Sequence, residues 1–249
     1  MIGYIVATAL AIFLGQASSH LIRRLSLIVE KDDELKLVFK TLKEGFKVDY
    51  ICSVINLILF NLLIYFIGPS FSCFIYMITI SLLQVVFVID YKMQLIPDTI
   101  QILLGIVGIV NVAYMGILQG FSQVLNFMLA GIIGAGIFLL LGLLGKLIFK
   151  KDGMGMGDVK LMAALGLIFG IKEILTITLV SFFISAIFSI ILILTKVKEL
   201  DSYIPFGPFI VIAAVAIMFT GYNLYVDLFI GMCTALSNLI NDLMFKIMN

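Results

Sequence analysis

Long apolar runs separated by short polar stretches make up most of the chain. A helix that crosses a bilayer needs about 20 predominantly apolar residues, and most of these runs reach or approach that length. We therefore expect an all-α, polytopic integral membrane protein with about eight or nine transmembrane helices. The expected spans are 3–22, 51–67, 71–89, 99–118, 122–149, a short one at 157–170, 171–194 and 204–221.

The last apolar run, 224–245, is interrupted by polar residues. Asp227, Asn238, Asn241 and Asp242 all fall within it. A segment of this kind forms either a further span or an amphipathic helix that lies in the membrane interface. Of these two alternatives, we expect a span.

Composition indicates that lipid covers much of the surface. Of the 249 residues, 63% are hydrophobic and 12% are charged, and the mean hydropathy is +1.23. Soluble domains have about 45–50% apolar and about 25% charged residues, so the surplus apolar surface must face a lipid bilayer. The net charge of +1 gives no attraction for nucleic acid. One histidine and three separated cysteines do not form a zinc site or a disulfide framework, so we expect no bound metal.

Basic residues are distributed unevenly between the two sides of the expected spans. The first apolar run is preceded by no positive charge and followed by Arg23 and Arg24. This pattern is typical of a retained helix with its N-terminus outside rather than of a cleaved signal peptide. Alternation then puts most lysines on the cytoplasmic side, and Lys172 is the clear exception. The segments expected in the cytoplasm are 23–50, 90–98, 150–160 and 195–203.

The stretch 30–50 is the only sizeable polar segment. Acidic residues lead it, lysines trail it, and apolar residues recur at helical spacing. We expect an amphipathic cytoplasmic helix that rests on the membrane surface. The chain then divides into a first part, 1–50, with one span and this segment, and a multi-span membrane domain, 51–249.

Three aspartates lie where the expected spans meet the cytoplasmic side. Asp90 ends one span, Asp98 begins the next, and Asp158 begins the short span. Ionisable groups at membrane depth are costly and often functional. Two carboxylates brought together share one proton, and such a pair activates a water for attack on a peptide carbonyl, as in aspartic proteases. Each aspartate taken alone is also explained as a loop acid or a helix cap.

Four segments together resemble the type IV prepilin peptidases, a family of membrane-embedded aspartic proteases. Residues 154–170, MGMGDVKLMAALGLIFG, resemble the GxGD segment of that family. Residues 89–98, IDYKMQLIPD, are similar to its upstream motif, and residues 203–209, YIPFGPF, look like its PFGP segment. Residues 15–24 have the spacing of its first motif, with the outer Gly and Arg retained. The resemblance therefore covers most of the chain, in order.

The resemblance implies an aspartic endopeptidase that removes the short basic leader of type IV prepilins or pseudopilins. Family members cut after a glycine at the cytoplasmic boundary of the apolar segment, in a bacterial cell membrane, with the active site facing the cytoplasm. Asp90 and Asp158 are then the catalytic pair, and Asp98 is the alternative first acid. The residues implied to bind substrate or shape the site are Gly155, Gly157, Lys160, Pro205, Phe206 and Gly207.

One departure from the family concerns a second activity. Many members carry two CxxC pairs in a cytoplasmic domain after the first span and methylate the new amino terminus with S-adenosylmethionine. Here the corresponding stretch, 26–50, is short and has no cysteine. We therefore expect a peptidase-only form that uses no cofactor. His20, a single histidine at a helix end near Arg23, is expected to be structural.

Two other functions fit parts of the pattern. Presenilin-like and signal-peptide-peptidase-like proteases share GxGD, but they place a Pro-Ala-Leu motif late in the chain, where this chain has Pro205, Phe206 and Gly207. A non-enzymatic membrane carrier or scaffold would also use glycine-rich, proline-interrupted helices. Against a carrier, the acids lie at one face rather than at the midplane, and no inverted repeat is visible. Prepilin cleavage is therefore the favoured function.

Overall fold

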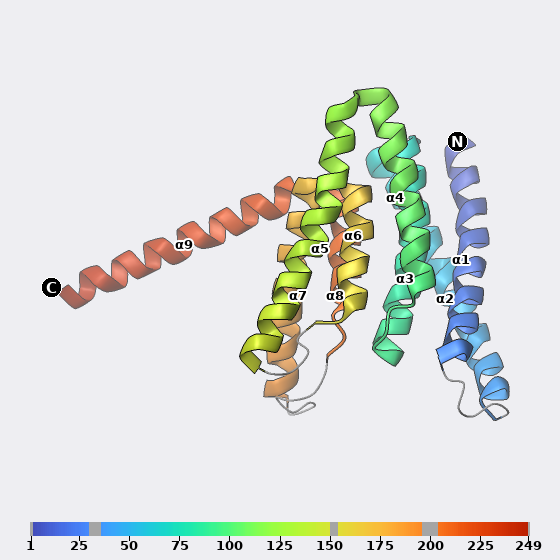
Figure 1. Ribbon diagram of the computed structural model, residues 1–249, viewed down its shortest axis with the longest axis horizontal. Coiled ribbons are helices and arrows are strands. Elements are labelled where there is room, and N and C mark those ends of the chain that lie inside the picture. Colours follow the sequence, from blue (N-terminus) through green and yellow to red (C-terminus); the bar gives the residue numbers. More distant parts are fainter. Residues whose placement is uncertain (1, 30–35, 150–153, 196–203, 249) are drawn as a thin grey trace.

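The computed structural model describes residues 2–29, 36–149, 154–195 and 204–248 of the chain. Its described residues form nine α-helices and no strand, which confirms the all-α fold class (Figure 1). The helices are α1 (Ile2–Val29), α2 (Lys36–Ile67), α3 (Phe71–Met93), α4 (Asp98–Gln119), α5 (Phe121–Phe149), α6 (Met156–Phe169), α7 (Ile171–Leu194), α8 (Gly207–Thr220) and α9 (Asn223–Met248).

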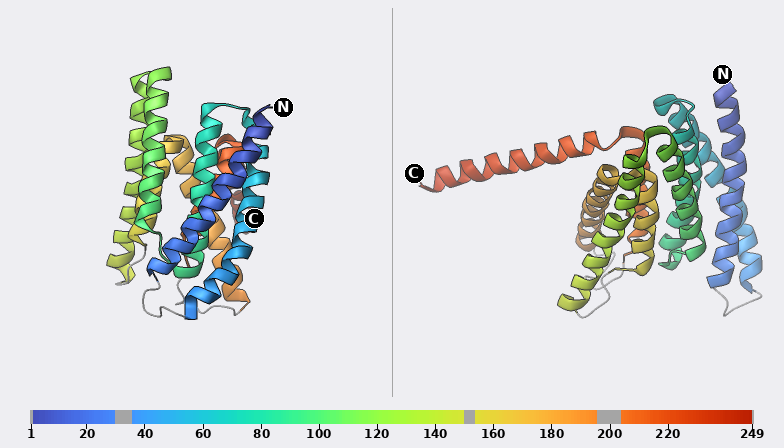
Figure 2. Two further views of the ribbon diagram at one scale, coloured as in Figure 1. Left: turned by 90° about the vertical axis from the view of Figure 1, so that its right-hand side faces the viewer. Right: turned by 45° about the horizontal axis from the view of Figure 1, so that its top comes forward.

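Helices α1 to α8 form one bundle and alternate in direction. α1, α3, α5 and α7 end at the lower end of Figure 1, where α2, α4, α6 and α8 begin. The two views of Figure 2 show the same arrangement. The described helix ends that flank the segments expected on one side of the membrane therefore lie at the same end of the bundle. We call this end the lower end.

Helices α3, α6 and α8, which carry parts of three of the four sequence motifs, lie inside the bundle. In the most apolar stretch of α3, 61% of the residues are buried, against 28% for α5 and 22% for α7. α6 and α8 also bury most of their residues. Small residues allow this close packing: a Cβ on Gly166 of α6 would lie 2.4 Å from the backbone nitrogen of Gly131 in α5. The outer helices expose many large apolar side chains, as surfaces that face lipid do.

Fewer helices qualify as complete spans than the sequence predicted. Among the described helices, α1, α3, α4, α5 and α7 are long and apolar enough to cross a membrane, and the bent pair α8–α9 adds one more if it is a single span. The expected count of eight or nine is therefore not confirmed. The spans expected at 157–170 and 204–221 correspond to α6 and α8, which have 14 residues each. Such a helix is roughly 21 Å long, shorter than the hydrocarbon core of about 30 Å. The long apolar helices still indicate a multi-pass membrane protein.

Helix α2 joins two elements that were predicted separately. The amphipathic segment expected at 30–50 lies partly outside the described residues. From Lys36 its backbone is helical and continues without a break to Ile67, and the apolar part of that helix is Ile51–Ile67. The boundary expected between residues 50 and 51 thus falls inside one helix.

Helix α9 leaves the bundle. The chain direction turns by 108° between α8 and α9, at Gly221, whose φ of 68° suits glycine. α9 then extends away from the other helices (Figure 1 and the right view of Figure 2). A ninth span would run antiparallel beside α8, so the span expected at 224–245 is not confirmed.

Candidate active site

Asp90 is a buried acid in the last turn of α3. Its side chain is 3% exposed, and its Oδ2 accepts a hydrogen bond of 2.9 Å from the backbone N–H of Gly207. This contact requires glycine, because a Cβ on Gly207 would lie 2.5 Å from Oδ2 of Asp90. The hydrogen bond ties the end of α3 to the start of α8.

Asp158 is a second buried acid, in the first turn of α6. It is 5% exposed, and its backbone N–H donates to the carbonyl oxygen of Gly155 at 3.1 Å. Gly155 is the N-cap of α6, with an extended backbone, and it lies beside the Asp158 carboxylate: a Cβ on Gly155 would lie 3.4 Å from Oδ2 of Asp158. The carboxylate is therefore held at the N-terminus of α6, where the helix dipole favours an anion.

The fold brings these two acids together. The carboxyl groups of Asp90 and Asp158 interact electrostatically, and both line a cavity of about 280 Å³ at the lower end of the bundle. Like charges repel strongly in a buried site, so such a pair holds one shared proton in preference to two negative charges. The expected site residues that line the cavity are Asp90, Asp98, Gly155, Gly157, Asp158 and Lys160.

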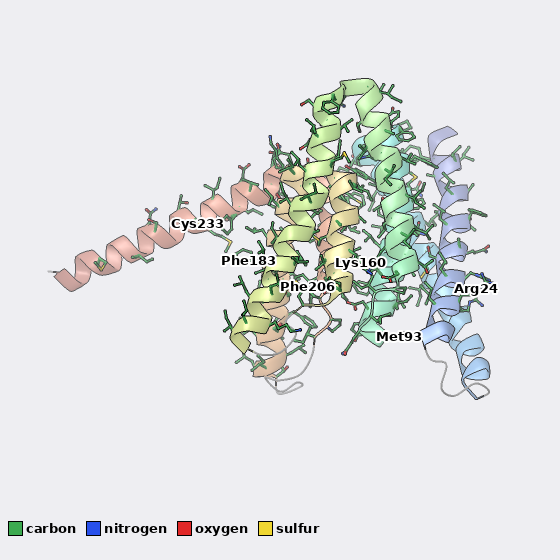
Figure 3. The ribbon with its side chains drawn as sticks, viewed as in Figure 1. Arg24, Met93, Lys160, Phe183, Phe206 and Cys233 are labelled. Carbon is green, nitrogen blue, oxygen red and sulfur yellow. The ribbon has the colours of Figure 1, made fainter. Side chains whose placement is uncertain are left out.

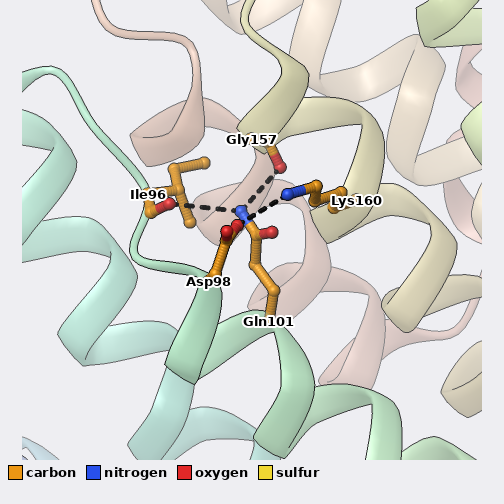
Figure 4. A network of polar contacts seen from close by, with 5 residues as sticks. All are labelled: Ile96, Asp98, Gln101, Gly157 and Lys160. Carbon is orange, nitrogen blue, oxygen red and sulfur yellow. Dashed lines mark hydrogen bonds and ion pairs between the residues drawn. The ribbon is translucent and has the colours of Figure 1, made fainter.

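Asp98 lies on the same cavity in a different environment. It begins α4, its side chain is 70% exposed, and its Oδ1 lies 2.7 Å from Nζ of Lys160 (Figure 4). An exposed ion pair of this kind contributes about 0–1 kcal/mol. Asp98 is thus a solvated acid with a cationic partner, whereas Asp90 is a buried acid that faces Asp158.

The turn before α8 leads into Gly207, whose backbone N–H contacts Asp90. Pro205 is buried, and Phe206 directly precedes α8. The ring centroid of Phe206 lies 5.0 Å from that of Phe182 and 5.7 Å from that of Phe138, so α5 and α7 hold the turn in place. Pro205, Phe206 and Gly207 are not among the described residues that line the cavity. Of the three, Gly207 contacts an acid of the cavity directly, through its hydrogen bond to Asp90.

Gln101 is a site residue that the sequence reasoning missed. Its side chain is 5% exposed, and its Nε2 donates to the carbonyl oxygens of Gly157 at 3.1 Å and Ile96 at 3.3 Å (Figure 4). The sequence signal for it is one polar residue near the start of an apolar run, just after Asp98. That signal does not reveal a contact with α6, which lies 56 residues further along the chain.

The histidine and the cysteines lie apart from the acids. His20 is exposed on α1. Cys52 and Cys73 are buried, and Cys233 is exposed on α9, outside the bundle (Figure 3). Within the part of the chain that the structure describes, no three His, Cys, Asp or Glu side chains are grouped so as to hold a metal ion.

The central part of the chain matches the model of a known protein family. The model of the type IV leader peptidase family matches residues 77–190, a segment that contains Asp90, Asp98 and Asp158. No solved structure shows a significant match to the chain.

Several curated proteins named prepilin leader peptidase/N-methyltransferase are similar to the chain. The protein from Xanthomonas campestris pv. campestris is 34% identical over 139 residues, which are 55% of this chain and 46% of that protein. The protein from Legionella pneumophila is 31% identical over 154 residues, 60% of this chain and 50% of that protein. The protein from Aeromonas salmonicida is 46% identical over 68 residues, 27% of this chain and 23% of that protein. The chain spans at most about half the length of these curated relatives.

Proposed function

We propose, from the premise that residues 77–190 belong to the type IV leader peptidase family, that the chain is a membrane-embedded aspartic endopeptidase. Its substrates are the leader peptides of type IV prepilins or prepilin-like proteins. The observation that carries the proposal is the pair of buried acids, Asp90 and Asp158, which interact across one cavity. Two carboxylates in this arrangement supply the acid and the base that peptide hydrolysis needs.

The reaction uses one ionised and one protonated carboxyl group. The ionised member takes a proton from a water molecule, and the water oxygen bonds to the carbonyl carbon of the scissile peptide. The protonated member donates its proton to the carbonyl oxygen, so the tetrahedral intermediate is neutral. When the intermediate collapses, the C–N bond breaks, the carboxyl group that took the proton from water gives it to the leaving nitrogen, and the other carboxylate takes a hydroxyl proton from the intermediate. The products are the carboxyl group of the leader and the free amino terminus of the mature protein.

The backbone around the pair limits how far each acid moves during these steps. The N–H of Gly207 holds the carboxylate of Asp90, and the hydrogen bond from the Asp158 N–H to the Gly155 carbonyl oxygen fixes the backbone at Asp158. Catalytic groups that are held before the substrate arrives lose little freedom when it binds, which lowers the barrier. Gly155 and Gly157 carry no side chain at the cavity wall, so an extended peptide backbone approaches closely there.

The charge distribution supports cleavage at the cytoplasmic face of a bacterial cell membrane. The cavity lies at the end of the bundle that adjoins most of the basic segments, and basic residues favour the cytoplasmic side. A prepilin or pseudopilin has its basic leader on that side and its apolar segment in the bilayer. The scissile bond at the boundary between the two then lies at the depth of the cavity. The partners of the chain are therefore this signal segment and lipid, without nucleic acid.

Methyl transfer is not part of the proposed activity. The curated relatives include N-methyltransferase in their names, whereas residues 26–50 of this chain contain no cysteine for a CxxC zinc site. We propose that the chain cleaves the leader without using S-adenosylmethionine.

A prepilin-like substrate tests the cleavage proposal. The substrate carries a basic leader, a glycine and an apolar segment, and it is incubated with the purified chain in detergent. We expect one cut directly after the glycine, identified from the mass of the product. Intact substrate, or cuts scattered along the leader, would overturn the proposed function.

Cleavage is expected to proceed unchanged in EDTA. The two carboxylates activate water without a metal ion, so removing divalent cations leaves the catalytic groups intact. The measurement is the initial rate of leader cleavage before and after chelation. A rate that EDTA abolishes and added zinc restores would contradict this mechanism.

A further inference from the structure

Gln101 connects the two segments that carry the buried acids. Its side chain leaves the first turn of α4 and reaches both the loop after α3, at Ile96, and the first turn of α6, at Gly157 (Figure 4). Asp90 lies in the last turn before that loop, and Asp158 directly follows Gly157. One buried amide therefore joins the two halves of the site.

The hydrogen bonds of Gln101 fix the peptide group next to Asp158. Its Nε2 donates to the carbonyl oxygen of Gly157 at 3.1 Å, and this carbonyl belongs to the same peptide unit as the N–H of Asp158. That N–H donates to the carbonyl oxygen of Gly155, also at 3.1 Å. A planar peptide that is held at both its carbonyl and its N–H has one orientation. The direction in which the Asp158 side chain leaves the backbone is fixed as a result.

The fit around Gly157 leaves little space for another arrangement. A Cβ on Gly157 would lie 3.2 Å from Cβ of Ile96 and 3.4 Å from Nε2 of Gln101, so glycine at this position allows α6 to approach. The two acceptors are both carbonyl oxygens, so the nitrogen of the amide must face them. The other amide atom, Oε1 of Gln101, is buried without a hydrogen-bond partner. The two hydrogen bonds that Nε2 donates therefore determine the orientation of the Gln101 side chain.

We propose that Gln101 is a positioning residue for peptide cleavage, which sets the geometry of the Asp90–Asp158 pair from outside the cavity. It is not among the described residues that line the cavity, and it is linked to Asp158 through the backbone of Gly157. The second link between α4 and α6, the pair of Asp98 and Lys160, is 70% and 51% exposed, and solvent weakens it. The inference rests on the proposed function, because it assigns Gln101 a role in that reaction.

Two substitutions test this role by removing the donor. Gln101→Met has a similar volume without a hydrogen-bonding group, and Gln101→Glu keeps the shape and replaces the nitrogen by an oxygen. We expect kcat for leader cleavage to fall by about 10- to 100-fold in each variant, since a displacement of about 1 Å costs up to about 100-fold. KM should change by less than about twofold, because the substrate contacts remain. The matched control is Gln119→Met, which makes the same change at an exposed glutamine at the other end of α4 and should cleave like the wild type.

The outcomes separate this inference from the proposed function. The thermal midpoint of each purified variant is measured with kcat and KM. An active wild type together with unchanged kcat in both Gln101 variants would overturn the positioning role and leave the proposed function standing. A loss confined to KM, or matched by a collapse of the thermal midpoint in both variants, would also overturn it. A folded wild type that does not cleave would overturn the proposed function, and the inference with it.

Discussion

Asparagine in place of Asp90 or Asp158 is expected to lower the rate of leader cleavage by about a thousandfold or more. Asparagine retains the size and shape of aspartate but neither accepts nor donates the catalytic proton, and acid–base catalysis contributes about 10²–10⁴-fold per group. Both acids are buried and interact with each other, so either change removes the shared proton. The measurement is the initial rate with a prepilin-like substrate for each purified single variant.

Asp98→Asn is the matched control for these variants. Asp98 lines the same cavity but is 70% exposed and paired with Lys160. Loss of such a pair is worth about 0–1 kcal/mol, so we expect cleavage within about fivefold of wild type. An inactive Asp98→Asn beside an active Asp90→Asn would make Asp98 the first catalytic acid. Wild-type rates in all three variants would rule out the aspartic mechanism.

Alanine at Gly207 is expected to reduce kcat by about 100-fold. The added Cβ would lie 2.5 Å from Oδ2 and 3.1 Å from Cγ of Asp90, so either the acid rotates or α8 moves away. Both movements break the hydrogen bond from the Gly207 N–H and displace a catalytic group, and misplacement of about 1 Å costs about 100-fold. Overpacking also costs about 1–3 kcal/mol of stability. The measurement is kcat together with the thermal midpoint.

Gly105→Ala is the control for the added methyl group. Gly105 lies within α4, and a Cβ there meets no atom within 4 Å. We expect wild-type cleavage and a free energy of unfolding equal to wild type or higher by up to about 1 kcal/mol, because alanine favours helix over glycine. Equal rates for Gly207→Ala and Gly105→Ala would refute the requirement for glycine beside Asp90.

The fold class and the convergence of the two acids were predictable from the sequence for physical reasons. Long apolar runs have few stable structures in lipid other than helices, and alternating spans bring Asp90 and Asp158 to one end. The family resemblance, inferred from four short segments, is confirmed over residues 77–190. The sequence pointed to Gly207 only as part of the segment 203–209, which resembles the PFGP motif of the family. Its contact with Asp90 joins positions 117 residues apart, and no local spacing shows such a contact.

The sequence could not fix the number of spans, because an apolar run does not reveal what covers it. α6 and α8 are apolar because other helices surround them, and runs of about 10–14 residues are typical of helices buried in protein. Gln101 was missed for a related reason. In a sequence, a glutamine within an apolar run looks the same whether it faces lipid headgroups or donates to a neighbouring helix, and only the packing of α4 against α6 distinguishes the two.

The most direct test of a proton-sharing pair is the pH dependence of kcat/KM for leader cleavage by the purified wild-type chain. Catalysis needs one protonated and one ionised carboxyl group. The rate should therefore fall at low pH, where both groups carry protons, and at high pH, where both are ionised, giving a bell-shaped profile. Asp98→Asn should show the same bell. A rate that is flat, or that changes in one direction only across the pH range in which the chain stays folded, would contradict the proposed mechanism.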